Sequence, residues 1–126
     1  MIILNFSHPL TESQIRETET LAKMTVEKVL NVHVQFDNDQ PFMEQILPLA
    51  EAIPLDSETL QTAPILIVLP SSNFIAAELL AWLHGLMGYF PAVLRIKPKS
   101  GSIPPAYEAA EILSLQSLRD TSRKYR

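Results

Sequence analysis

The sequence contains no cysteine and only three glycines among its 126 residues. Without cysteine, disulfides, thiolate metal sites and cysteine nucleophiles are excluded, and a reducing cytoplasm becomes the expected compartment. The glycines are Gly85, Gly88 and Gly101, so neither a GxGxxG motif nor a P-loop can be written. A GxSxG nucleophile elbow is also absent. These absences argue against the common dinucleotide, nucleoside-triphosphate and serine-hydrolase sites.

Metal-binding and membrane-spanning patterns are missing as well. No cluster of His, Asp and Glu has metal-ligand spacing, so we expect no metal, and no other cofactor is indicated. The longest apolar stretch, residues 74–90, is interrupted by Glu78 and His84 and is shorter than the roughly 20 residues of a bilayer span. The N-terminus lacks the basic region of a signal peptide. We therefore expect a cytoplasmic protein with no membrane partner.

Charge is distributed unevenly along the chain. Residues 1–94 carry eleven acidic and three basic side chains, whereas residues 95–126 carry three acidic and seven basic ones. The two parts therefore have net charges of −8 and +4, which add to the −4 of the whole chain. DNA would be repelled by the acidic part, but a small anion could be held by a local basic patch.

The length and the 47% hydrophobic content indicate one domain, residues 1–126, with a single core. Four short segments rich in β-branched and aromatic residues predict strands. These segments are Ile2–Phe6, Val32–Phe36, Ile65–Leu69 and Ala92–Ile96. The third is apolar throughout, which is typical of a strand covered on both faces, while the second and fourth alternate and are expected nearer a sheet edge.

Helical patterns separate the predicted strands. The first predicted helix, over 11–30, begins with a capping box formed by Thr11 and Gln14. The second, over 41–53, contains Pro48, which must kink or divide it. The third, over 73–89, has the strongest pattern and is capped by Ser72 or Asn73. A fifth strand over 110–115 and a helix from 116 or 117 follow. This alternation predicts a doubly wound α/β domain: a mostly parallel sheet of about five strands with helices on both faces.

A candidate ligand site follows from this topology. In open α/β sheets, ligands bind beyond the carboxyl ends of the strands, where the strand order reverses. With a flavodoxin-like order, 2-1-3-4-5, that point lies between the first and third strands. The turns that follow these strands are Ser7-His8-Pro9 and Ser71-Ser72-Asn73, and helix N-termini after such turns attract phosphate. The alternative is that these residues only cap helices.

Further candidate contacts are one histidine and three basic residues. His8 could act as an acid or base, but no carboxylate lies nearby in the sequence, so we favour ligand contact; the alternative is a half-buried residue packed beside Pro9. Arg95, Lys97 and Lys99 end the fourth strand, and we expect at least one of them to contact a phosphate. The loop over 98–105 is a candidate ligand loop.

The apolar segment 74–90 also bears on oligomerisation. Its apolar side chains occupy more than one helix face: Leu79, Leu80, Trp82, Leu83, Leu86 and Met87. This surplus predicts cover by a second copy in a homodimer. The alternative is a central helix that two other helices flank.

Three segments also resemble a known family. The opening run 1–11 (MIILNFSHPLT), the Pro70–Asn73 turn and the segment 111–119 (EILSLQSLR) are similar to small CRISPR-associated accessory proteins of type III systems. The resemblance covers nearly the whole chain, and its most specific part is the first strand with its turn. It implies a single Rossmann-like domain that binds a cyclic oligoadenylate, the second messenger of type III antiviral defence, at Ser7, His8, Ser71, Ser72 and Asn73.

From the resemblance we expect a nucleotide-binding protein that sequesters or senses the messenger, with cyclic tetra-adenylate as the first expectation. A symmetric homodimer would suit a two-fold symmetric ring, and a higher assembly with ligand is an open alternative. A metal-independent ring nuclease and a protein-interaction subunit without a ligand also remain open. Binding is favoured over cleavage because no acid/base pair is visible, so we predict no catalytic residue.

Overall fold

A five-stranded sheet forms the centre of the computed structural model, which describes all 126 residues. Its strands are β1 (Ile2–Asn5), β2 (Lys28–Asn31), β3 (Ile65–Val68), β4 (Ala92–Pro98) and β5 (Tyr107–Ser114). They lie in the order β2-β1-β3-β4-β5, and all neighbours are parallel except β4 and β5, which are antiparallel. The mostly parallel α/β sheet and the strand order considered from the sequence are thus confirmed.

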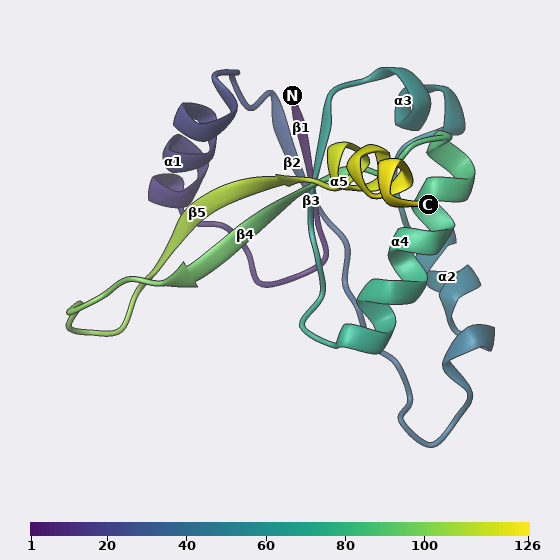
Figure 1. Cartoon of the computed structure of the whole chain (residues 1–126). Helices are drawn as coiled ribbons and strands as arrows, with labels where there is room; N and C mark the ends of the chain where they lie inside the picture. The colour runs from purple at the N-terminus through teal and green to yellow at the C-terminus, as the bar shows by residue number, and fades with distance from the viewer.

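Helices cover both faces of the sheet. Helix α1 (Glu12–Ala22) lies on one face, and α2 (Ile46–Glu51), α3 (Ser57–Thr62) and α4 (Asn73–Met87) lie on the other (Figure 1). A larger apolar core of 15 buried residues fills the α4 side, and a smaller one of five fills the α1 side. All four residues of β3 are buried, as expected for a strand covered on both faces.

Helix α1 is shorter than the predicted helix over 11–30. The capping box is confirmed: the Gln14 N–H donates to Thr11 Oγ1 at 3.1 Å, and the Thr11 N–H donates to Gln14 Oε1 at 2.9 Å. The helix ends at Ala22 because Lys23 adopts the left-handed conformation, with φ 53°. Neither glycine nor proline marks the end of this helix, and Val26 and Val29 continue the helical spacing of apolar residues. The sequence pattern therefore predicted a helix longer than α1.

The predicted second strand over 32–36 is wrong by four residues. Strand β2 pairs with β1 from Ile2 opposite Lys28 to Asn5 opposite Asn31. One further bond, from the Val32 N–H to the Asn5 carbonyl at 2.8 Å, ends the pairing because β1 stops there. The segment beyond it leaves the sheet, and Val34 and Phe36 pack against the larger core.

The predicted helix over 41–53 is divided, as Pro48 required. A 3-10 turn spans Phe42–Glu44, and α2 begins at Ile46. Pro48 is the third residue of α2, in the first turn, where its missing N–H costs no hydrogen bond. Helix α3 was not predicted, because it is only six residues long; its signal is the N-cap Asp56, whose side chain accepts from the Thr59 N–H at 2.7 Å.

Helix α4 matches its prediction closely. Ser72 is the N-cap, and Gly88 ends the helix at φ 79°. Its apolar surplus is mostly covered within the chain, since α2 and α3 both contact α4 and Trp82 is half-buried against the core. The two-flanking-helices alternative therefore describes most of this surface, although Phe74 in the first turn of α4 is 67% exposed. The homodimer stays a prediction. None of the helices combines the length and apolarity needed to cross a membrane.

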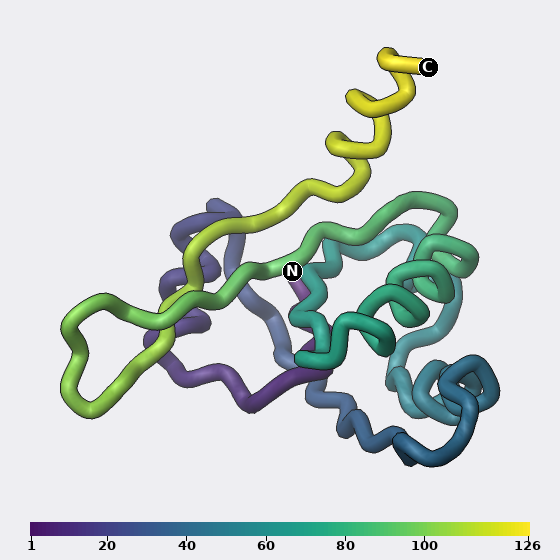
Figure 2. The backbone as a smooth tube through the Cα atoms, turned by 60° about the horizontal axis from the view of Figure 1, so that its bottom comes forward, coloured from purple at the N-terminus to yellow at the C-terminus, as the bar shows by residue number.

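The last strand, β5, runs antiparallel to its neighbour β4, and no direction was predicted for it from the sequence. The fifth strand was expected over 110–115 but begins at Tyr107, and the segment before it is a hairpin that joins antiparallel strands. Ser114 therefore lies opposite Ala92, the first residue of β4. Helix α5 (Leu115–Ser122) therefore starts at the end of the sheet where the parallel strands begin, and it projects away from the rest of the chain (Figure 2).

Candidate functional site

The turn after β1 is held by a buried asparagine. Asn5 is fully buried, and its side chain makes three hydrogen bonds. Its Oδ1 accepts from the Ser7 N–H at 3.0 Å, and its Nδ2 donates to the His8 carbonyl and to Asn31 Oδ1, both at 2.9 Å. These bonds fix the backbone of the turn while the side chains of Ser7 and His8 remain exposed. The sequence therefore presents these two side chains on a rigid support.

The two predicted turns meet at one cavity of about 340 Å³. Ser7 and His8 line it from the end of β1, and Ser71 and Ser72 line it from the end of β3. The segment after β2 supplies the opposite wall, including His33, Val34 and Phe36; the Phe36 ring meets Phe42 edge to face at 5.2 Å. We call this the α4-side cavity. It lies where the topology predicts a ligand, between β1 and β3.

The N-terminus of α4 borders the α4-side cavity. Ser72 Oγ accepts from the Ile75 N–H at 3.4 Å, and the Ser72 carbonyl accepts from the Ala76 N–H at 2.9 Å. This cap leaves the backbone N–H groups of Asn73 and Phe74 for an anion. The first turn of α4 carries no acidic residue, whereas α1 has Glu12 in its first turn. Asn73 is the exposed first residue of α4 and does not line the cavity.

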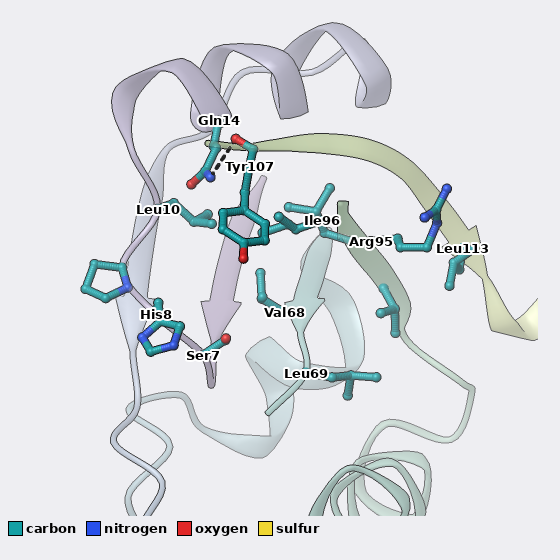
Figure 3. A pocket seen from close by; sticks show the side chains of 13 residues that line it. Ser7, His8, Leu10, Gln14, Val68, Leu69, Arg95, Ile96, Tyr107 and Leu113 are labelled. Atoms are coloured by element: carbon teal, nitrogen blue, oxygen red, sulfur yellow. Dashed lines mark hydrogen bonds between the residues drawn. The ribbon is translucent and has the colours of Figure 1, made fainter. Parts of the chain in front are cut away.

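A second cavity, of about 550 Å³, lies on the other side of the Ser7-His8 turn. We call it the α1-side cavity. Its walls are mostly apolar and come from the segment between β1 and α1 and from β3, β4 and β5; they include Leu10, Val68, Leu69, Val93, Ile96 and Leu113. Figure 3 shows the Tyr107 ring between Leu10 and Ile96, with its hydroxyl directed toward the end where Ser7 and His8 lie. Ser7 and His8 thus form a wall common to both cavities.

The three predicted basic residues are only partly brought to the site. Arg95 lines the α1-side cavity, but its Nε donates to Glu111 Oε1 at 2.7 Å. Lys97 lies 3.7 Å from Glu108 and lines neither cavity, and Lys99 is exposed at the base of the hairpin loop. Strand β4 extends beyond the ends of β1 and β3, since Leu66 pairs with Ala92, and this extension carries both lysines past the cavities.

The sequence pattern did not predict that Gln14 and Tyr107 line one cavity and are joined by a hydrogen bond. Gln14 Nε2 donates to the Tyr107 carbonyl at 3.1 Å, while Gln14 Oε1 closes the capping box with the Thr11 N–H. Glu17 Oε1 accepts from the Ala109 N–H at 3.2 Å, so α1 binds the free edge of β5 twice. The capping box was visible in the sequence. The contact with Tyr107, 93 residues away, had no sequence signal.

Titratable groups at the site are sparse. No aspartate or glutamate lines either cavity, so no carboxylate is placed to orient the His8 ring. No group of three or more His, Asp or Glu side chains is gathered where it could hold a metal ion. The arrangement offers hydroxyl groups, backbone N–H groups, the imidazoles of His8 and His33, and an apolar slot. Such groups bind an anion that carries an aromatic moiety.

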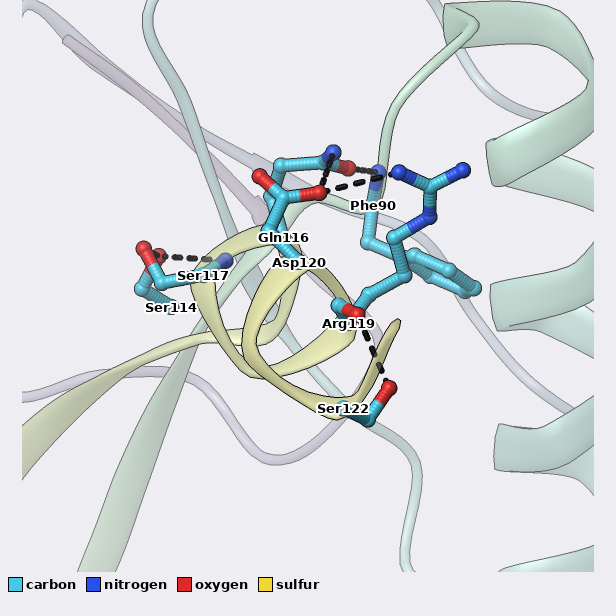
Figure 4. A network of polar contacts seen from close by, with 7 residues as sticks. All are labelled: Phe90, Ser114, Gln116, Ser117, Arg119, Asp120 and Ser122. Carbon is cyan, nitrogen blue, oxygen red and sulfur yellow. Dashed lines mark hydrogen bonds and ion pairs between the residues drawn. The ribbon is translucent and has the colours of Figure 1, made fainter. Parts of the chain in front are cut away.

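A separate polar network lies at the opposite end of the sheet, where the parallel strands begin (Figure 4). Gln116 Oε1 accepts from the Phe90 N–H at 2.8 Å, and its Nε2 donates to Asp120 Oδ1 at 3.1 Å. Arg119 binds the same Asp120 oxygen at 2.9 Å. Of these contacts, the bond between Phe90 and Gln116 joins α5 to the rest of the chain, while Leu118 remains 68% exposed. The apolar surface of α5 is therefore presented to the surroundings.

Comparisons with known proteins add no family assignment. No protein-family model, curated protein or solved structure matches this chain.

Proposed function

We propose that this chain binds a cyclic oligoadenylate, with cyclic tetra-adenylate as the first candidate, and sequesters or senses it in type III CRISPR antiviral signalling. The observation that carries the proposal is the convergence of Ser7, His8, Ser71 and Ser72 on one cavity beside the N-terminus of α4. Hydroxyl and backbone N–H groups at a helix N-terminus suit a phosphate diester. The order of the five strands supports assignment of the sheet to the Rossmann-like group.

The resemblance supplies the chemical identity of the ligand, and the geometry supports its anionic part. The segments that carry the resemblance include both turns that line the α4-side cavity. A ring with two-fold symmetry presents phosphates on opposite sides, so two copies of the chain could offer the same turns to it. In this proposal the two copies face each other through the carboxyl ends of their strands.

Binding without cleavage is the form of the proposal that the site supports best. Ring cleavage by a metal-independent nuclease requires a group that activates the ribose 2′-hydroxyl or protonates the leaving oxygen. His8 is the only titratable side chain at the wall common to the two cavities, and no carboxylate lines either of them. We therefore assign His8 to hydrogen bonding with the ligand.

Calorimetry with cyclic tri-, tetra- and hexa-adenylate tests the proposal. We expect one ring to bind, and we expect the double variant His8→Ala, Ser72→Ala to weaken its binding by about tenfold or more. Ser122→Ala, at the opposite edge of the sheet, is the matched control and should leave the affinity unchanged. Failure of all three rings to bind at micromolar protein would contradict the proposal.

Product analysis separates the two forms of the proposal. Excess labelled ring is incubated with the protein and resolved by chromatography, and the expected result is intact ring. Linear products over several turnovers, lost in His8→Ala, would replace the binder with a ring nuclease. If no ring binds but the chain associates with itself or another protein, the interaction-subunit alternative gains.

A further inference from the structure

The α1-side cavity has the features of a pocket for a flat aromatic group. Its walls are mostly apolar, and the phenol ring of Tyr107 stands in it (Figure 3). Its volume of about 550 Å³ lies within the range typical of small-molecule sites. Tyr107 is 58% exposed although it borders an apolar floor, so a ligand stacked on the ring would remove this apolar surface from water.

The backbone at Tyr107 is held in place before any ligand arrives. Its carbonyl accepts from Gln14 Nε2 at 3.1 Å, and Gln14 is itself buried and held by the α1 capping box. Two residues further along β5, the Ala109 N–H is bound by Glu17 of α1. A ring on a backbone held at two points loses little conformational freedom when a base stacks on it.

The wall shared by the two cavities connects this pocket to the anion-binding turns. Ser7 and His8 line both cavities, so a phosphate held in the α4-side cavity is adjacent to the α1-side cavity. A nucleotide has this bipartite form, with an anionic group separated from a planar base by one sugar. We infer that the α1-side cavity accepts a purine base of the ligand, stacked on Tyr107, while the phosphate lies at the Ser7-His8 turn. This inference rests on the proposed function and names the part of the ligand that each cavity holds.

Three variants test the inference by calorimetry with cyclic tetra-adenylate. Tyr107→Ala should weaken binding by about tenfold or more, because it removes the aromatic face on which the base stacks. Tyr107→Phe keeps the ring and should bind within about threefold of the unmodified chain. Tyr125→Ala removes a tyrosine that is 86% exposed on the other edge and should change nothing. Thermal unfolding of each variant confirms that it is folded.

Methyl NMR spectra of the unmodified chain provide a second measurement that needs no variant. A bound purine should shift the methyl signals of Leu10, Leu69 and Ile96 through its ring current, whereas Leu118 should not shift. Suppose that cyclic tetra-adenylate binds, but Tyr107→Ala keeps full affinity and these methyl signals stay unchanged. The assignment of the base to the α1-side cavity is then wrong, and the proposed function stands. If the unmodified chain binds no ring at all, the proposed function fails and the base assignment fails with it.

Discussion

The Asn5 side chain donates to Asn31 Oδ1 at 2.9 Å and so joins the carboxyl ends of two parallel strands, β1 and β2. The same amide group also binds the backbone of Ser7 and His8, so one fully buried side chain connects the sheet to the candidate site. An asparagine at this position explains how a short turn without glycine keeps a defined shape beside a ligand site.

Removal of the Asn5 amide should destabilise both the fold and the site. Asn5→Ala leaves the partly buried Ser7 N–H and His8 carbonyl without their Asn5 partner and empties a buried position, and we expect the free energy of unfolding to fall by about 2 to 3 kcal/mol. Asn31→Ala removes only one of the three bonds and should cost about 1 kcal/mol. Urea unfolding measures both values. Equal costs for the two variants would contradict the central role of Asn5.

The ion pairs of the β4–β5 hairpin predict which cation contacts the ligand. Arg95 lines the α1-side cavity but is bound to Glu111, whereas Lys97, bound to Glu108, lines neither cavity. Glu111→Gln should free Arg95 and strengthen binding of cyclic tetra-adenylate by about threefold, with a steeper dependence on salt. The matched variant Glu108→Gln frees Lys97 and should have a smaller effect. A larger gain for Glu108→Gln would assign the phosphate contact to Lys97.

Asp56 should give the fold a sensitivity to acid. The hydrogen bond from the Thr59 backbone N–H, together with one from the Thr59 side chain, lowers the pKa of the Asp56 carboxyl below its ordinary value of 3.8. Because the folded pKa is the lower one, the stabilising contribution is complete at pH values above the unfolded pKa and is lost as the pH falls through the folded one.

The variant Asp56→Asn isolates this effect. Asparagine is also a good N-cap, so α3 should persist, but its stability should no longer depend on ionisation at this position. The difference in thermal midpoint between the two proteins, followed from pH 6 to pH 2, should therefore move in favour of the variant below about pH 4. A constant difference across this range would show that the Asp56 carboxylate contributes nothing to the acid dependence.

Leu118 predicts where a contact between copies would form. The apolar side chains in the middle of α4 pack within the chain, whereas α5 projects from it (Figure 2) and its Leu118 is 68% exposed. A helix of eight residues is marginal in isolation, which favours its cover by a partner. We expect the protein to be a dimer by light scattering without ligand, and Leu118→Asp to make it monomeric. Met43→Asp, at a residue 75% exposed elsewhere, is the control and should leave the dimer intact.

A monomer at all concentrations would contradict this contact and would leave ligand binding to be judged separately. The reason is that α5 begins opposite Ala92, at the amino-terminal edge, whereas Ser7 and His8 follow the carboxyl end of β1. A contact through α5 and a contact through a shared ring would use different surfaces.

The parts of the fold that sequence reasoning predicted are those decided by local chemistry. The capping box of Thr11, the N-cap of α4 and the division of the predicted 41–53 helix ahead of Pro48 each depend on residues within a few positions of one another. The continuous apolar run of β3 needed only the rule that a doubly covered strand has no polar face. These features require no knowledge of distant partners.

The errors arose where distant pairing decides the structure. Strand β2 occupies 28–31 because β1 ends at Asn5, which no local pattern near residue 30 reveals. Tyr107 entered the site because β5 turns back along β4, and its anchor Gln14 lies 93 residues earlier. The two turns of the candidate site were found because they follow from topology alone.

The reversal of β5 also determines how the molecule can be labelled. It brings the hairpin loop beyond the carboxyl ends of the strands and brings α5 out at the other edge. Because the chain has no cysteine, one introduced at Ser100 or at Ser122 would be the only thiol available to a dye. A dye at Ser100 would report on ligand binding and a dye at Ser122 on self-association, so each event could be followed by fluorescence without disturbance of the other.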